Sequence, residues 1–195
     1  MGERISLALA GLALIFLVGV VYAGLTMPER PPNLEYTLSV ETSVNGNAVD
    51  ASGTTNLPSG ARLSIVVDRL YRLKGTGTWR AARVGEEIAV VQDGRWQATI
   101  PVTDGSWVDE ITGRVNRKEI DPVEAVQCAL RTTVVFSPLM EQDPSVRKAL
   151  GPDGAGLAAS NAAMQVGTYW IIRSQTTAEM PLHLEHERAL LANLR

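Results

Sequence analysis

The uncharged segment from Ile5 to Leu25 constrains this chain more than any other feature. It holds 21 residues, and Ser6 is its one clearly polar side chain. Because a helix rises about 1.5 Å per residue, this length spans the roughly 30 Å hydrocarbon core of a bilayer. The sequence therefore predicts a transmembrane helix within residues 1–25, acting as a signal anchor.

A cleavable signal peptide is the alternative interpretation of the same segment. Val21-Tyr22-Ala23 offers small or aliphatic residues where a signal peptidase reads, and cleavage near Ala23 would give a secreted protein. However, Glu3 offsets Arg4, and the apolar run exceeds the roughly 7 to 15 residues of a signal core. We therefore favour a retained, single-pass anchor in the cell membrane with the following domain outside the cytoplasm.

Residues 26–33 are rich in proline and separate this segment from the rest of the chain. Pro28, Pro31 and Pro32 cannot continue a helix and favour an extended polyproline conformation. At roughly 3 Å per residue, the seven residues Met27–Asn33 of the spacer cover about 20 Å. It should hold the following domain near the membrane surface.

The pattern from residue 34 onward is that of a β protein. Asn45-Gly46-Asn47 and Asp93-Gly94 are strong hairpin signals, the second typical of a type I′ turn. Strands are expected at 35–44, 48–55, 63–72, 88–92, 95–101, 126–136 and 166–174. Because no long alternation of strands and helices occurs, we predict one antiparallel β-sandwich, immunoglobulin/fibronectin-like, over residues 34–195.

Two short helices are expected near the C-terminus. Asp143 is a good N-cap, Pro144 suits the first helical position and Gly151 ends the helix. A second helix should begin at about 181. Residues 102–123 are polar and are expected to be irregular, and the segment Lys74–Trp79 is expected to be a flexible loop.

A turn between two expected strands carries a likeness to known proteins. It reads Gly53-Thr-Thr-Asn56-Leu57-Pro58-Ser59-Gly60, and Asp93-Gly94 before Trp96 and the segment 142–157 extend the likeness. The Gly-x-Thr-Asn-Leu-Pro-x-Gly pattern resembles that of poorly characterised bacterial exported β-sandwich domains. The resemblance implies export and a sandwich over residues 34–175, and it implies no catalytic residues.

Cys128 is the single cysteine, so no intramolecular disulfide forms. Period-2 alternation places Cys128 on one strand face with Val126, Leu130 and Val134. We therefore expect a buried, structural thiol.

Charge and motif content argue against several function classes. The 18 Lys and Arg against 21 Asp and Glu, with no run of like charges, argue against a nucleic-acid partner. His183 and His186, near Glu187, are interpreted as solvated surface residues, since zinc sites need three or four ligands. No nucleophile-elbow motif is present. We predict no catalytic, cofactor-binding or metal-binding residue, and no cofactor.

Three function hypotheses remain. The first is a non-catalytic membrane-anchored structural or interaction module, an accessory subunit of a cell-envelope complex with a protein partner. The second is a glycan- or peptide-binding module, which predicts that Trp79 and Trp107, both in expected loops, are exposed contact residues. The third is a hydrolase with paired carboxylates among Glu86-Glu87, Asp109-Glu110 and Glu119 with Asp121, two of them within about 10 Å.

The anchor hypothesis makes a direct prediction. The chain should stay in the membrane fraction after washing with high salt and with alkaline carbonate, because lipid rather than charge holds an apolar helix. Immunodetection in the pellet and mass spectrometry of the N-terminus measure this. A mature protein that begins at Gly24 would show cleavage instead.

Overall fold

The structure is a computed structural model, and it describes residues 35–102 and 105–180. The anchor Ile5–Leu25, the spacer 26–33 and the expected helix from 181, with both histidines, lie outside these ranges. Across the described ranges, no helix is long and apolar enough to cross a membrane.

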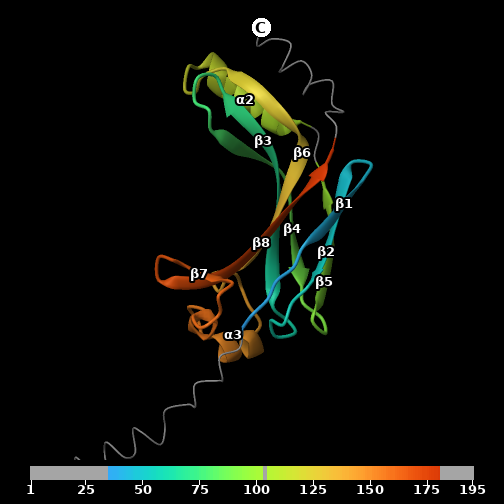
Figure 1. The fold of residues 1–195 in the computed structure, drawn as a ribbon, viewed down its shortest axis with the longest axis vertical. Helices are drawn as coiled ribbons and strands as arrows, with labels where there is room; N and C mark the ends of the chain where they lie inside the picture. The colour runs from blue at the N-terminus through green and yellow to red at the C-terminus, as the bar shows by residue number, and fades with distance from the viewer. Residues whose placement is uncertain (1–34, 103–104, 181–195) are drawn as a thin grey trace, which may run out of the picture. The chain divides into compact units, whose positions relative to one another are not determined.

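The described residues form a mainly β structure with two antiparallel sheets and few helices, consistent with the predicted β-sandwich (Figure 1). The first sheet has the order β1-β2-β5, with β1 Glu41–Asn45, β2 Ala48–Thr54 and β5 Arg95–Pro101. The second has the order β4-β3-β6-β8-β7, with β3 Arg62–Leu73, β4 Trp79–Val90, β6 Val123–Phe136, β7 Ala163–Val166 and β8 Tyr169–Glu179. The helices are α2 Ser106–Asn116, α3 Pro144–Leu150 and the 3₁₀ helix η1 Ala155–Leu157.

The expected turns form, but one of them joins different sheets. Asp93 and Gly94 have φ of 48° and 75°, the two positive values that a type I′ turn requires. Beyond the bridge between Gln92 and Arg95, however, β4 and β5 do not pair as a hairpin. β5 pairs with β2 instead, so this turn carries the chain from the larger sheet to the smaller one.

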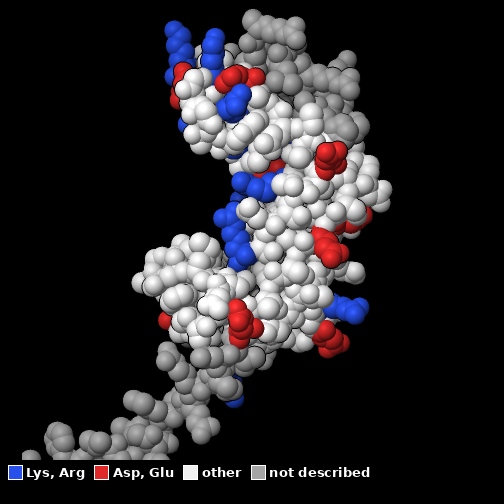
Figure 2. All heavy atoms as spheres, viewed as in Figure 1, with Lys and Arg blue, Asp and Glu red and all other residues white. Residues whose placement is uncertain are grey.

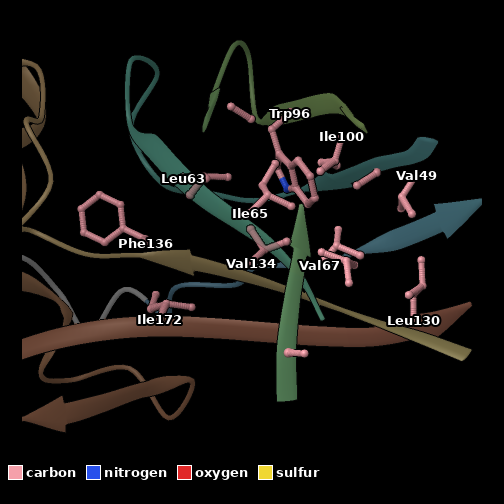
Figure 3. Packing of buried hydrophobic residues seen from close by; sticks show 14 of the residues in the cluster. Val49, Leu63, Ile65, Val67, Trp96, Ile100, Leu130, Val134, Phe136 and Ile172 are labelled. Carbon is pink, nitrogen blue, oxygen red and sulfur yellow. The ribbon is translucent and has the colours of Figure 1, made fainter. Parts of the chain in front are cut away.

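The core lies between the sheets, and β3 shows why. Its residues alternate without exception between buried and half-buried, from Arg62 to Leu73. In Figure 3, Leu63, Ile65 and Val67 of β3 point into the cluster that contains Trp96. Trp96 comes close to the backbone because β2 has Gly53 there: a Cβ at Gly53 would lie 2.8 Å from the indole ring.

One row of paired residues crosses all five strands of the larger sheet. Leu63 of β3 pairs with Ala89 of β4 and with Phe136 of β6. Phe136 pairs with Ile172 of β8, which pairs with Ala163 of β7. Four of the five are buried, and Ala163 is half-buried. The row fixes the end of the sheet at which β4 ends and β7 lies.

The expectation that residues 102–123 are irregular is wrong, because α2 forms there. The strands β3, β4 and β6 extend beyond the core between the sheets, and α2 covers their inner face at that end. Trp107, Val108 and Ile111 are buried, and the Trp107 ring lies 6.5 Å from that of Tyr71. The polar residues that suggested a loop lie on the solvent side of this helix.

The helix α3 forms as expected. The Asp143 carboxylate accepts a hydrogen bond from the Ser145 backbone N–H at 2.8 Å, and its hydrogen bonds from Ser145 lower the pKa of Asp143. The buried Gln142 side chain fastens the start of α3 to β3, since it exchanges hydrogen bonds with the backbone N–H and C=O of Arg62. Gly60, with φ of 88°, packs beside Asp143.

The expectation of a buried thiol is also wrong, because Cys128 is exposed. Arg69 pairs with Leu130 and Tyr71 pairs with Val126, so three residues of β6 face one residue of β3. This bulge breaks the period-2 alternation and turns Cys128 away from the core. The bulge is held by Arg69 Nη1, which donates to the Gln127 carbonyl at 3.3 Å, and by the Met180 N–H, which donates to the Cys128 carbonyl at 2.9 Å.

The exposure of Cys128 predicts its reactivity. A bulky maleimide should modify the native chain at a rate close to that of the denatured chain, because no side-chain packing shields the thiol. A mass shift followed over time in buffer and in denaturant measures both rates. Protection of the native thiol would show that the bulge does not turn it outward.

Candidate interaction surface

The outer face of the five-stranded sheet is the surface turned away from the core. On β3 it carries the even-numbered residues, all half-buried. Each of these residues pairs with a residue of β4 that lies on the same face. The pairs are Arg62 with Val90, Ser64 with Ile88, Val66 with Glu86, Asp68 with Arg83, Leu70 with Ala81 and Arg72 with Trp79. The two ends of this face therefore carry apolar side chains on β4, and its middle carries charged ones.

Exposed apolar side chains gather at the edges of this sheet. Among the described residues, the exposed large hydrophobic side chains are Trp79, Ile88, Val90, Leu139, Met164 and Val166. Three of these six belong to β4 and two to β7, the two edge strands. Scattered single exposures are ordinary, whereas clustering at sheet edges is typical of an interaction surface.

The charges in the middle of the outer face form one ion pair between strands and one within β4. Arg131 of β6 donates to the Asp68 carboxylate of β3 at 2.8 Å, in a partly buried position. Arg83 and Glu86 of β4 form an exposed pair at 2.6 Å. Figure 2 shows Lys and Arg side chains along the hollowed side of the domain, between the lobe of β7 and α3 and the lobe of α2.

The two tryptophans predicted to be contact residues lie on opposite faces of the sheet. Trp79 is 38 % exposed on the outer face, and the Arg72 guanidinium lies 5.3 Å from its ring centroid in a cation–π contact. Arg72 also pairs with Glu124 at 3.3 Å, so the Trp79 ring is held in place from one side. Trp79 is therefore partly exposed, as a contact residue must be, and its contact with a partner or ligand stays a prediction.

The expectation that Trp107 is exposed is wrong. Only 3 % of it is exposed, because α2 carries it under the inner face of the sheet against Tyr71. Its indole N–H has no hydrogen-bond partner among the described residues. Trp107 therefore packs in the interior at the extended end of the sheet, contrary to the expected exposure.

Sequence reasoning missed the surface that Ile88 and Val90 form at the edge of β4. Both side chains are 46 % exposed, and we call Ile88 and Val90 the β4 edge surface. Ile88 and Val90 line a shallow hollow of about 670 Å³ that continues over Gly53 and Gln97 of the smaller sheet. The sequence signal for this surface was the run from Gly85 to Val90, in which apolar residues follow two glutamates.

A second shallow hollow adjoins the first over the smaller sheet. It measures about 660 Å³, and both hollows share Glu41, Ser52 and Gln97. Its lining is polar, and the Thr99 hydroxyl donates to the Asp50 carboxylate there at 2.6 Å. The β4 edge surface therefore opens onto a polar depression, which suits an extended polar chain better than an apolar small molecule.

Two of the carboxylates proposed for a hydrolase are paired with arginines. Glu86 pairs with Arg83, and Glu119 pairs with Arg117 at 2.6 Å. The hydrogen bond from Arg117 lowers the pKa of Glu119, whereas a general acid needs a raised pKa. Within the described residues, no group of three or more His, Cys, Asp or Glu is placed to hold a metal ion.

The two tryptophans predict a contrast in stability. Trp107→Ala should lower the free energy of unfolding by about 3 to 5 kcal/mol, because it removes a buried ring. Trp79→Ala should cost only about 1 kcal/mol or less, since it removes a partly exposed ring and one cation–π contact. Denaturant unfolding of the two purified variants measures both values, and equal costs would contradict the assignment of the two faces.

Comparison of the chain with protein-family models, with curated proteins and with solved structures finds no match. The resemblance of the Gly53–Gly60 turn to exported β-sandwich domains therefore stays a prediction. The function has to be argued from the surface of this chain.

Proposed function

We propose that the protein is a non-catalytic, membrane-anchored extracytoplasmic interaction module, which binds a protein partner of the cell envelope through the β4 edge surface. In this role it is an accessory subunit of a membrane complex. The observation that carries the proposal is the exposure of Ile88 and Val90 on an edge strand, beside an open hollow.

Only part of the edge of β4 is protected against pairing with a strand of another chain. Edge strands expose backbone N–H and C=O groups, and charged side chains and bulges normally keep other chains from pairing with them. β4 has both devices in its middle: a change of register between Arg83 and Gly85, and the Arg83–Glu86 ion pair. Ile88 and Val90 follow without a charge between them. An extended segment of a partner can add beside this end of β4.

The composition of this end also suits a protein interface. Protein interfaces combine an apolar centre with a polar rim. Ile88 and Val90 supply the apolar centre, and Glu87, Arg95 and Gln97 supply polar groups around it. Gly85 allows β4 to approach the end of β5, since a Cβ there would lie 2.6 Å from the Pro101 carbonyl oxygen. The two sheets therefore meet closely beside this surface and hold it rigid.

The finer fold class and the location belong to the same proposal. We infer an immunoglobulin/fibronectin-like sandwich, supported by seven strands divided as β1-β2-β5 and β4-β3-β6-β8, with β7 added at the edge. Domains of this architecture are common at cell surfaces. The apolar segment Ile5–Leu25 and the proline-rich spacer support a retained anchor that keeps the module at the membrane.

A glycan- or peptide-binding module is the second candidate, favoured by the position of Trp79. The Arg72 guanidinium lies over the Trp79 ring and holds it in place. The ring is still partly exposed to solvent. A sugar or a peptide side chain can stack there. Loss of ligand binding in Trp79→Ala, with binding retained in Ile88→Glu/Val90→Glu, would favour this candidate.

The interaction proposal predicts selective loss of a partner. The full chain carrying Ile88→Glu/Val90→Glu should no longer recover its partner from detergent-solubilised membranes. Association would bury the two new carboxylates without a partner charge, which opposes binding. The matched control is Gln175→Glu/Thr177→Glu, which places the same two charges at exposed positions of β8. Thermal melts should show that both variants fold. Recovery of the same partner by all three proteins would overturn the proposal.

A further inference from the structure

Residues 154–172 include no charged side chain, although one residue in five of the whole chain is charged. These 19 residues form η1, β7 and the start of β8. Figure 2 shows few charged atoms on the lobe that Figure 1 identifies as β7 and its neighbours. The stretch ends at Arg173, which is exposed.

Apolar side chains of this lobe meet solvent. Met164 and Val166 of β7 are exposed, and Tyr169, which pairs with Val166, is half-buried. Leu139 is the most exposed of the large hydrophobic residues described, at 67 %. It belongs to the same lobe, because its neighbour Pro138 lies near Gly154, which in turn lies against the Trp170 backbone. We call Leu139, Met164, Val166 and Tyr169 the β7 tip.

The described chain begins beside the β7 tip. The Tyr36 N–H donates to the Ser160 hydroxyl at 3.0 Å, and that hydroxyl donates to the Tyr36 carbonyl at 3.1 Å. The Asn161 side chain donates to the Glu35 carboxylate at 3.2 Å. Asn56 holds the same segment from the other side, since its amide donates to the Glu35 carbonyl and its oxygen accepts from the Thr37 N–H, both at 2.7 Å.

The length of the preceding chain limits how far this end can be from a membrane. In the expected polyproline conformation, the seven residues Met27–Asn33 would reach about 20 Å, less than the length of the long strands of the domain. The lobe fixed to Glu35 and Tyr36 is therefore the part of the domain closest to the spacer along the chain. It also contains the uncharged residues 154–172 and exposes apolar groups.

We propose that the β7 tip inserts into the headgroup region of the bilayer that holds the anchor. The inference rests on the retained anchor of the proposed function. Apolar side chains of Leu139, Met164 and Val166 leave water for the boundary of the acyl chains, and Tyr169 takes the amphipathic position typical of interfacial aromatics. Arg173, exposed on the same strand, meets lipid phosphates.

The test uses the full chain with Cys128→Ser, a substitution at an exposed position, and one new cysteine at a time. An environment-sensitive fluorophore is attached at Met164→Cys, at Val166→Cys or, as control, at Glu110→Cys. Glu110 is exposed on α2, at the opposite end of the long strands from β7 (Figure 1). The protein is reconstituted into vesicles of phosphatidylcholine and phosphatidylglycerol, with or without lipids that carry a nitroxide on the headgroup.

Lipid contact predicts a blue shift and nitroxide quenching at 164 and 166, and neither at 110. If the chain floats with the vesicles but 166 is quenched no more than 110, the inference is overturned and the anchor stands. If the chain does not float with the vesicles, the anchor and the inference both fail. A blue shift that is insensitive to nitroxide and disappears as protein is diluted in lipid would show that a second copy covers the tip, which also overturns it.

Discussion

The alternation of β3 is the constraint on which the rest of this structure depends. Twelve residues place one side chain in the core and the next on the outer face, and β3 pairs along its length with both β4 and β6. The inner set accepts the smaller sheet at one end and α2 at the other. The outer set carries Asp68 near its centre, and the exposed large apolar side chains of the described sheet lie on its edge strands β4 and β7.

Arg69 is the one charged residue among the buried positions of β3, and it explains how the bulge is tolerated. It occupies an inner position of β3 where a hydrocarbon side chain would be expected, and it is almost completely buried. Its guanidinium donates to the carbonyls of Gln127 and Met180, the latter at 2.9 Å. Burial of a charged side chain is costly unless it is hydrogen-bonded, so Arg69 secures the irregular part of β6 and the end of β8 together.

Local patterns predicted the strands that follow simple rules and failed where tertiary pairing overrides them. The hairpin at Gly46, the strand β3 and the cap at Asp143 depend on neighbours in sequence, and they were predicted. Cys128 was misplaced because a bulge depends on the partner strand. The expected strand 166–174 contains the turn at Gly167, whose φ of 61° marks the end of β7. A β-rich pattern gives no sign of such a break.

The candidate surface was predictable only in part for the same reason. Trp79 could be found because aromatic residues near loops are often exposed, and Trp107 looked the same in sequence. The run from Gly85 to Val90 did not identify Ile88 and Val90 as exposed, since a strand at an edge and a strand at the centre have similar residues. Which strand lies at an edge is decided by β3 pairing with β4 on one side and with β6 on the other.

The row from Ala89 through Leu63, Phe136 and Ile172 to Ala163 has a consequence for encounter with a partner. It places the Ile88–Val90 end of β4 and the Met164 end of β7 at the same height on opposite edges of one sheet. Under the proposed anchoring at this end, the partner surface would lie within the thin layer of solvent next to the lipid. A partner in the same bilayer would then search in two dimensions at a high effective concentration, which would strengthen association through a small contact.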